Sequence, residues 1–251
     1  MLFIDNIILI GFFASLLAGL ATGVGAIPVL FLNDVSPKLL DSLLGFAAGV
    51  MLAASVFSLI IPSLEIGGVG ITSIGIITGA IFVHFLDRYV PHFHFIYGPE
   101  GPTSSLKKIW LFIFAITIHN IPEGLAVGVS FGLGDLRAAI VVATAIGLQN
   151  MPEGLGVALP LRRENYSRKK SFGIATLTGL VEPAAALIGV IIVTIAHAIL
   201  PLALSFAAGA MIFVISDEII PESHRKGFER EATFGLMAGF ILMMILDNYF
   251  G

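Results

Sequence analysis

Eight long apolar segments restrict what this 251-residue chain can fold into. Each is long enough to cross roughly 30 Å of hydrocarbon as a helix, which takes about 20 residues. Because a bilayer core holds no water to satisfy backbone N–H and C=O groups, such segments form helices that satisfy them internally. We therefore expect an all-α polytopic membrane protein with a single transmembrane domain over residues 1–251. Its helices are expected at about residues 7–32, 39–61, 67–85, 109–133, 136–161, 172–200, 202–220 and 232–249.

The composition agrees with this class of protein. Hydrophobic residues make up 57% of the chain and charged residues 12%, so the lipid bilayer is its main partner and no nucleic-acid-binding surface is expected. The first apolar segment is too long for a signal-peptide core and no basic residue precedes it, so we interpret it as a retained span. The chain has no cysteine, which excludes disulfides and thiolate metal ligands.

The basic residues predict an orientation in the membrane. Only Arg137 lies on one side, whereas the other 12 of the 13 basic residues lie in four connections on the opposite side. These are Lys38, Arg88, Lys107, Lys108, Arg162, Arg163, Arg168, Lys169, Lys170, Arg225, Lys226 and Arg230. Since Lys and Arg are retained on the cytoplasmic side, we expect a multi-pass protein of the plasma or inner cell membrane with both termini outside the cytoplasm.

The sequence also repeats itself. Phe-Ala-Ala-Gly at 46–49 recurs at 206–209, and Ile-Ile-Pro at 60–62 recurs at 219–221. Further pairs are Gly75 with Gly235, Gly79 with Gly239, Leu86-Asp87 with Leu246-Asp247, and Thr22-Gly23 with Thr178-Gly179. The first three segments (about 7–85) therefore match the last three (about 172–249). Because each copy follows its partner five spans later along the chain, which is an odd number, the two copies cross the membrane in opposite senses.

The two central segments (about 109–161) form their own repeat. His-Asn-Ile-Pro-Glu-Gly at 119–124 is followed 30 residues later by Gln-Asn-Met-Pro-Glu-Gly at 149–154. The predicted architecture is thus 3+2+3 with an in-plane pseudo-two-fold axis. In inverted-repeat transporters the substrate site lies near mid-membrane where the repeats meet.

These motifs bring ligating groups together. His119 and Glu123 stand one helical turn apart, with Asn120 about 100° away around the helix. Gln149, Asn150 and Glu153 repeat this geometry on the next segment.

The prolines and one further glutamate add oxygen ligands at this depth. Pro122 and Pro152 have no N–H, so the carbonyls of Ile118 and Leu148 lose their helical partners. Glu182 adds a third carboxylate, and three buried negative charges require protonation or cations.

A divalent-cation site is the interpretation that we favour. Imidazole, carboxylate and amide ligands suit zinc, with cadmium, iron(II) and manganese as alternatives, better than magnesium or calcium. Each polar group alone is also compatible with an interhelical hydrogen bond, and Glu123 with Glu153 is compatible with a proton relay. The pattern lacks His-Glu-x-x-His, which argues against metalloprotease chemistry; we expect no enzyme activity and no bound cofactor apart from the transported cation.

Two weaker groups of residues remain. Asp217, Glu218, Glu222 and His224 near the inner end of segment 202–220 form an exit path or simply solvate the helix end. His84, Asp87, His92 and His94 form a metal relay or are solvated loop and helix-end groups.

The 119–124 and 149–154 motifs resemble those of the ZIP (Zrt/Irt-like) family of divalent metal transporters, and the second motif resembles its GufA-like branch. The resemblance covers nearly the whole chain and implies eight spans, outside termini, metal movement toward the cytoplasm and a homodimer. It also implies a binuclear centre. One ion would bind His119, Glu123, Gln149 and Glu153, and a neighbouring ion would bind Asn120, Asn150 and Glu182, with Glu123 and Glu153 bridging. Many members carry His-Glu-x-x-His-Glu at the second motif, so the fewer imidazoles here broaden the range of metals.

The sequence thus predicts uptake of a divalent transition metal, zinc first, through a mid-membrane site. A proton-coupled exporter and a broad-specificity iron, manganese or cadmium transporter remain as alternatives. A receptor or scaffold would need a sizeable soluble domain, and the chain contains none.

Overall fold

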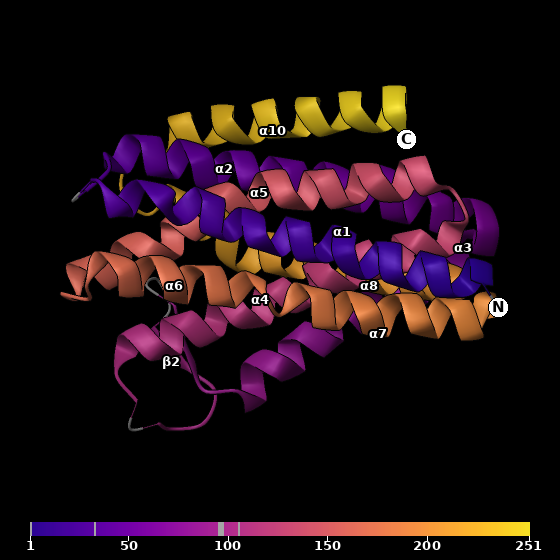
Figure 1. Ribbon diagram of the computed structural model, residues 1–251, viewed down its shortest axis with the longest axis horizontal. Coiled ribbons are helices and arrows are strands. Elements are labelled where there is room, and N and C mark those ends of the chain that lie inside the picture. Colours follow the sequence, from indigo (N-terminus) through magenta and orange to yellow (C-terminus); the bar gives the residue numbers. More distant parts are fainter. Residues whose placement is uncertain (1, 33, 95–97, 105) are drawn as a thin grey trace.

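The computed structural model describes residues 2–32, 34–94, 98–104 and 106–251, and it is a bundle of long helices (Figure 1). The α-helices are α1 (Leu2–Ala26), α2 (Pro37–Ala53), α3 (Ile61–Tyr89), α4 (Lys108–Ser130), α5 (Leu136–Arg163), α6 (Arg168–Gly179), α7 (Glu182–Ile195), α8 (Leu200–Val214), α9 (Ile220–His224) and α10 (Glu229–Phe250). The short elements are the 3-10 turns η1 (Ile27–Leu30), η3 (Phe131–Leu133) and η4 (His197–Ile199) and the π-helices η2 (Ala54–Ile60) and η5 (Ile215–Ile219).

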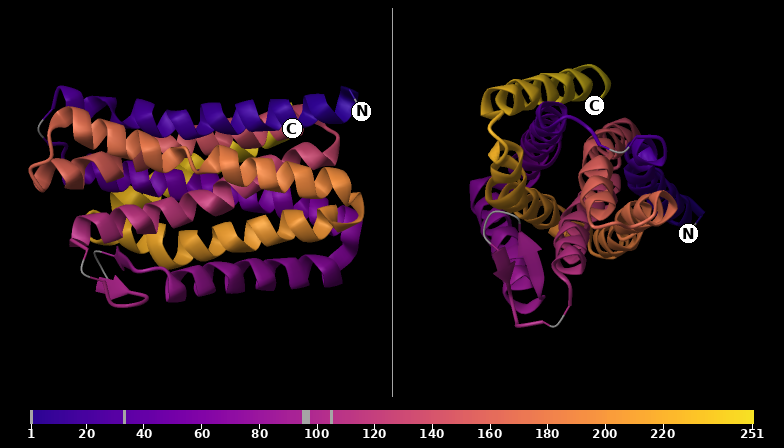
Figure 2. Two further views of the ribbon diagram at one scale, coloured as in Figure 1. Left: turned by 60° about the horizontal axis from the view of Figure 1, so that its bottom comes forward. Right: turned by 90° about the vertical axis from the view of Figure 1, so that its left-hand side faces the viewer.

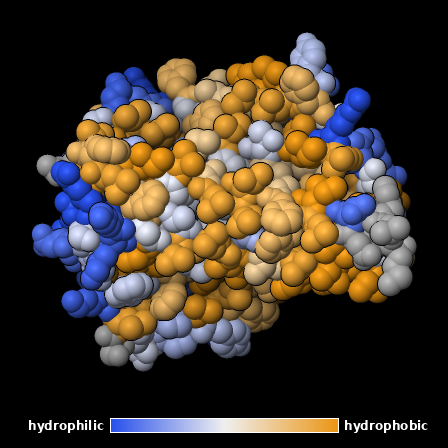
Figure 3. All heavy atoms as spheres, viewed as in Figure 1, coloured by the Kyte–Doolittle hydropathy of each residue, from blue (hydrophilic) through white to orange (hydrophobic). Residues whose placement is uncertain are grey.

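Six helical stretches within the described residues are long and apolar enough to cross a membrane: Asn6–Leu30, Pro37–Tyr89, Lys108–Leu133, Arg168–Ile195, His197–His224 and Glu229–Phe250. The second stretch has 53 residues, more than twice what one crossing needs. It contains Gly68 at φ 70°, a backbone conformation that favours glycine, where two helical parts meet at a kink. The chain reverses direction within this stretch (Figure 2). On the face shown in Figure 3, the middle is apolar and the hydrophilic side chains gather toward the two ends, as expected for a membrane protein.

The helices pack as two groups. In one group, α1 lies against α5, α6 and α7, and α4 lies against α7 and α5. In the other group, the closest pairs are α2 with α10 and α3 with α8. The groups meet where α2 contacts α5 and where α4 contacts α8, so α4 and α5 lie at the centre of the molecule (Figure 2).

Small residues set the closest helix pairs in the second group. Gly49 packs on a backbone carbonyl of α10, and its repeat partner Gly209 packs on one of α3. Gly79 and Gly239 make the reciprocal contacts, so a side-chain carbon at any of these positions would overlap a neighbouring backbone. Small residues that let backbones approach closely are typical of helix association in lipid.

The two π-helices occupy equivalent positions in the sequence repeat. η2 and η5 each follow the Phe-Ala-Ala-Gly segment and precede Ile-Pro. In each, the next backbone N–H reaches back five residues, from Ile61 to Val56 and from Ile220 to Ile215. Pro62 and Pro221 lack an N–H, which removes a normal i→i−4 bond nearby. The repeat in sequence is therefore matched by a repeat in local structure.

Three features of the fold differ from the sequence expectation: a broken span, an extended and interrupted helix, and a short hairpin. The segment expected at 172–200 is broken between α6 and α7, because Pro183 has no N–H to donate to the carbonyl four residues back. The expected 67–85 helix begins at Ile61 and is interrupted at Gly68. The connection after α3 holds a short antiparallel hairpin, β1 (His92–His94) with β2 (Gly98–Glu100), in which His92 pairs with Glu100.

Ion pairs tie the connections at the basic end together. Arg163 at the end of α5 donates a hydrogen bond of 2.8 Å to Asp34 in the connection before α2, and this contact holds the pKa of Asp34 below its usual value. Lys38 lies 2.9 Å from Glu231 at the start of α10. These pairs are largely exposed, so each adds little to stability.

The close packing of α3 on α8 is testable with two glycines of one helix. Gly79→Ala would push a methyl group into the carbonyl oxygen of Phe206, so we expect a loss of about 1–3 kcal/mol of stability and a lower thermal unfolding temperature in detergent. Gly70→Ala, where a methyl group meets open space, is the matched control and is expected to be neutral or stabilising. Equal unfolding temperatures for the two variants would contradict the packing.

Candidate metal centre

Both repeated motifs lie in the middle of α4 and α5, and their polar side chains are buried. Glu123, Gln149 and Asn150 are fully buried, and Asn120 is 1% exposed. His119 and Glu153 are 5% and 9% exposed, on the side of the motifs that borders a cavity. The structure therefore places all six motif residues inside the protein rather than against lipid.

The glycine that ends each motif allows another helix to come close. A side-chain carbon on Gly124 would overlap the backbone of Glu182 at the start of α7. One on Gly154 would overlap the backbone carbonyl of Thr22 in α1. Each Pro-Glu-Gly segment thus packs directly on the backbone of a helix from an outer repeat.

The two asparagine amides tie these helices together. Nδ2 of Asn150 donates to Oε1 of Glu182 and to the carbonyl of Ala18, each at 2.8 Å. Nδ2 of Asn120 donates to the carbonyl of Thr178, also at 2.8 Å. Because the N–H₂ groups are used in this way, the amide oxygens of both asparagines remain as acceptors.

Glu182 occupies the first turn of α7, directly after the break in this span. The proline that follows it suits the start of a helix, where its missing N–H costs nothing. A helix N-terminus carries a partial positive charge that favours a carboxylate. The break therefore brings the fully buried Glu182 to the level of the motifs on α4 and α5.

The centre is rich in acceptors and poor in donors. Both oxygens of Glu123, one oxygen each of Glu153 and Glu182, and the amide oxygens of Asn120 and Asn150 are buried with no hydrogen-bond partner among the described residues. The Gln149 amide faces Glu123 but falls short of full hydrogen-bond geometry. Glu123 is near enough to Glu153 and Glu182 for their charges to repel. Buried acceptors of this kind require protons or a cation.

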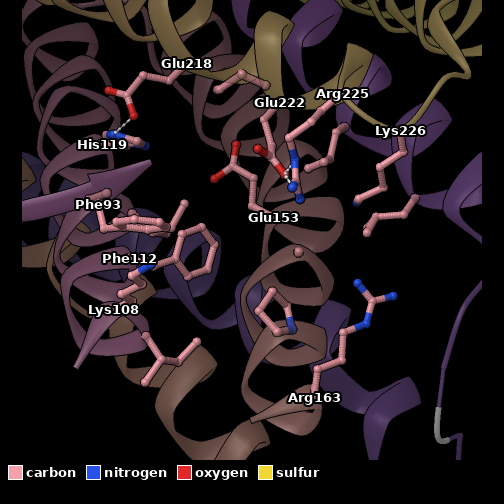
Figure 4. A pocket seen from close by; sticks show the side chains of 18 of the residues that line it. Phe93, Lys108, Phe112, His119, Glu153, Arg163, Glu218, Glu222, Arg225 and Lys226 are labelled. Atoms are coloured by element: carbon pink, nitrogen blue, oxygen red, sulfur yellow. Dashed lines mark hydrogen bonds and ion pairs between the residues drawn. The ribbon is translucent and has the colours of Figure 1, made fainter. Parts of the chain in front are cut away.

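His119 lies at the edge of this group. Its Nε2 forms an ion pair with Glu218 of η5 (Figure 4), so the structure joins the first motif to one of the weaker sequence candidates. Within the described part of the chain, no three His, Asp or Glu side chains are arranged so that together they could hold a metal ion. The buried oxygen atoms at the centre belong to a mixture of carboxylates and amides.

A second polar cluster continues from His119 toward the basic end. Nε2 of the buried His92 lies 3.7 Å from Oδ1 of Asp87 and 3.6 Å from Oε2 of Glu100. Asp87 is near enough to Glu218 and His119 to interact with their charges. Of these residues, Glu100 was missed by sequence reasoning, because only the hairpin register brings it opposite His92.

The remaining weaker candidates do not all join this cluster. Asp217 and Glu222 line the cavity described below, and Glu222 is paired with Arg225 at 3.0 Å. His224 bonds to the carbonyl of Ile220 and to Ser223, which are local contacts.

The described residues do not place the other two relay candidates, His84 and His94, in this cluster. His84 packs on the aromatic rings of Phe85 and Phe213, which gives it a structural role. His94 lies in β1, and its side chain is outside the described part of the structure.

A cavity of about 460 Å³ leads from the basic end to the centre (Figure 4). Its inner wall includes His119, Glu153 and Glu218, and its sides include apolar residues of α2, α4 and the hairpin. The basic residues that line it are Lys108, Arg163, Arg225 and Lys226. The centre can therefore be reached from this end of the molecule.

The repeat places a related contact at the opposite end of the fold. Oγ of Ser58 in η2 donates to Oδ1 of Asp247 at 2.5 Å. In the repeat Asp247 corresponds to Asp87, and Ser58 lies four residues before Pro62 as Asp217 lies four residues before Pro221. The sequence analysis noted the Asp87–Asp247 match but did not propose Asp247 as a functional residue. The match could have drawn attention to the contact that Asp247 makes with Ser58.

Access to the cavity is testable because the chain has no cysteine of its own. Ile116 of α4 is half-buried and lines the cavity, whereas Ile118 of the same helix is buried and does not. A small hydrophilic thiol reagent should modify an Ile116→Cys variant at least about tenfold faster than Ile118→Cys, because it needs water access to the thiolate. Mass spectrometry of the detergent-solubilised variants measures both rates, and equal rates would contradict an open cavity.

Residues 100–247 match the protein family described as ZIP zinc transporter. The chain is 45% identical over 251 aligned residues to the zinc transporter GufA of Myxococcus xanthus, with 96% of this chain and 99% of the relative covered. It is 43% identical to the zinc transporter ZIPB of Bordetella bronchiseptica, covering 92% of this chain and 78% of the relative. Zinc transporter ZIP11 of Homo sapiens is 35% identical, with 90% of this chain and 93% of the relative covered.

Proposed function

Since this chain belongs to the ZIP zinc transporter family, we propose that it carries divalent transition-metal cations, zinc first, across the cell membrane toward the cytoplasm. The observation that carries this proposal is the buried group of unpartnered carboxylate and amide oxygens between α4, α5 and α7. Relatives that cover nearly the whole chain are named zinc transporters, and such transport involves no covalent chemistry.

We propose eight membrane crossings in the 3+2+3 arrangement. The reversal of the chain within Pro37–Tyr89 (Figure 2) supports two crossings there. α5 supports the eighth, because its 28 residues span about 42 Å at 1.5 Å per residue although its central motif makes it too polar to count as an apolar stretch. Lys and Arg crowd the end that holds the cavity mouth, which we assign to the cytoplasm.

We assign two cation positions to the centre. The first uses His119, Glu123, Gln149 and Glu153. The second uses Asn120, Asn150 and Glu182, with Glu123 and Glu153 between them. Two divalent cations bring four positive charges to three carboxylates, which removes the repulsion among them. His119 forms an ion pair with Glu218, so binding at the first position requires its imidazole to exchange this partner for the cation.

The cavity and the polar cluster beyond His119 support a route to the cytoplasm. Glu218 and Asp217 on η5 border the cavity next to the centre, and Asp87, His92 and Glu100 extend the polar surface. Carboxylate and imidazole groups in series let a cation change ligands in small steps.

The packing suggests which part of the protein moves. Asn150 and Asn120 bond α5 and α4 to backbone carbonyls of α1 and α6, and the motif glycines press on α1 and α7. We therefore expect α1, α6 and α7 to move together with α4 and α5 against the other helices, rather than α4 and α5 alone. The homodimer implied by the family resemblance remains part of the proposal.

Replacement of Glu123 tests the assignment of the centre. Glu123→Gln keeps the shape of the side chain but removes the bridging charge, so zinc uptake into proteoliposomes should fall by more than about tenfold. Glu164→Gln changes an exposed carboxylate at the cavity mouth and is the matched control, which should transport normally. Wild-type uptake by a folded Glu123→Gln protein would remove the site assignment.

The pH of the outer solution offers a second test. Imidazole and carboxylate ligands bind metal only when deprotonated, so zinc uptake should decline as the outer pH falls from about 7 to about 5. The assay includes a protonophore, which collapses any proton gradient and leaves ligand protonation as the cause. Uptake that rises steeply with acid and disappears with the protonophore would favour proton-driven transport, and zinc efflux would favour the exporter.

A further inference from the structure

Two hydroxyl groups on α1 behave unlike nearly all others in the fold. Helical Ser and Thr side chains here usually donate to a carbonyl one turn back, as do Ser55, Thr117, Thr144, Thr176, Thr194 and Ser205. The hydroxyls of Ser15 and Thr22 are buried, with residue exposures of 0% and 1%, and have no hydrogen-bond partner among the described residues. A buried hydroxyl without a partner is costly, so its presence calls for a function.

The contacts of Ala18 explain why Thr22 is released from its helix. A threonine at this position would normally donate to the carbonyl four residues back, which belongs to Ala18. That oxygen has two lone pairs. In α1 one accepts the N–H of Thr22, and Nδ2 of Asn150 donates to the other at 2.8 Å. The motif on α5 therefore takes the acceptor that the Thr22 hydroxyl would otherwise use.

Thr22 lies beside the residues of the second cation position. A side-chain carbon on Gly179 would lie 2.5 Å from the Thr22 hydroxyl oxygen. Gly179 follows Thr178, whose carbonyl accepts the hydrogen bond from Asn120. The carbonyl of Thr22 packs against Gly154 in the α5 motif. One turn away on the same helix, a side-chain carbon on Gly19 would lie 3.5 Å from Oε1 of Glu182. This part of α1 thus packs beside Asn120, Asn150 and Glu182.

The sequence repeat shows what α1 contributes in place of a carboxylate. Thr22-Gly23 matches Thr178-Gly179 of the sixth span, where Glu182 follows four residues after the threonine. The residue four positions after Thr22 is Ala26. The first span therefore has no carboxylate at the position equivalent to Glu182, and an oxygen ligand from Thr22 adds no negative charge to the centre.

We propose that the Thr22 hydroxyl oxygen is a ligand of the cation at the second position and completes a set made only of oxygen atoms. This inference rests on the proposed function, because it presupposes the second cation position. Carboxylate, amide and hydroxyl oxygens suit hard cations such as Mn²⁺, whereas the imidazole of His119 gives the first position its affinity for Zn²⁺ and Cd²⁺. Thr22 therefore sets how well the second position accepts a hard divalent cation. Ser15, two turns toward the N-terminus, lies on the same face of α1 and also carries a buried hydroxyl.

The test compares two variants that differ by one oxygen atom. Thr22→Ser keeps the hydroxyl and Thr22→Ala removes it, and neither adds bulk to the contact with Gly154. Mn²⁺ binding to the purified full chain is measured from the electron paramagnetic resonance signal of the free ion, and Cd²⁺ binding by calorimetry. Thr22→Ala should weaken Mn²⁺ binding by about tenfold while Cd²⁺ binding at the first position stays within about twofold of wild type. Thr22→Ser should restore Mn²⁺ binding.

Two controls separate this inference from the function on which it rests. Thr144→Ala removes a hydroxyl that bonds back to its own helix on α5, and it should leave Mn²⁺ binding unchanged. Glu182→Gln tests the second position itself and should weaken Mn²⁺ binding at least as much as Thr22→Ala. Equal Mn²⁺ affinities for Thr22→Ala and Thr22→Ser would overturn the role of Thr22, whatever the outcome for Glu182→Gln. If Glu182→Gln loses Mn²⁺ binding and Thr22→Ala does not, the proposed function stands and only the role of Thr22 is refuted. Normal Mn²⁺ binding in Glu182→Gln would refute the second position itself.

Discussion

The structure depends on a layer of acceptor groups that membrane helices ordinarily exclude. Glu123, Glu153 and Glu182 converge in the interior with the amide oxygens of Asn120 and Asn150, and few donors face them. In a bilayer such a layer is stable only when protons or cations occupy it. Buried acceptors without partners have a high free energy when no cation is bound, and a bound cation lowers it. A cation carrier needs such a difference between its free and its loaded site.

The rest of the fold serves to hold this layer in place without supplying donors to it. Motif glycines let α1 and α7 approach α5 and α4 so closely that backbone, rather than bulky side chains, forms the walls. Both asparagines use their N–H₂ groups on the backbone of neighbouring helices and one on Glu182, which turns their oxygens toward the centre. Pro183 breaks the sixth span and so brings a helix N-terminus, with its favourable dipole, to Glu182. The close helix packing, the asparagine hydrogen bonds and the helix break at Pro183 together hold oxygen atoms in fixed positions at the centre.

The two repeats differ where function requires a difference. η2 and η5 have the same local geometry, yet Ser58 in one contacts Asp247 and Glu218 in the other pairs with His119. The Glu218 end opens through the cavity. On the centre itself, α7 supplies a carboxylate and α1 supplies hydroxyl groups. The duplicated scaffold thus supports an asymmetric path, as expected for a protein that binds a cation from one side and releases it to the other.

The sequence by itself determined the membrane class, the repeats, the family resemblance and the motif residues, because apolar length, periodicity and the placement of Pro, Glu and Asn are local properties. The tertiary structure decided which groups meet. It paired His119 with Glu218, placed Glu100 opposite His92 through the hairpin register, and moved His84 away into an aromatic contact. It also broke the sixth span before Glu182 and exposed the unusual state of Thr22, which depends on an amide donated from a helix 128 residues further along the chain. Contacts of this kind depend on how helices distant in sequence pack against each other, and no local pattern of residues encodes them.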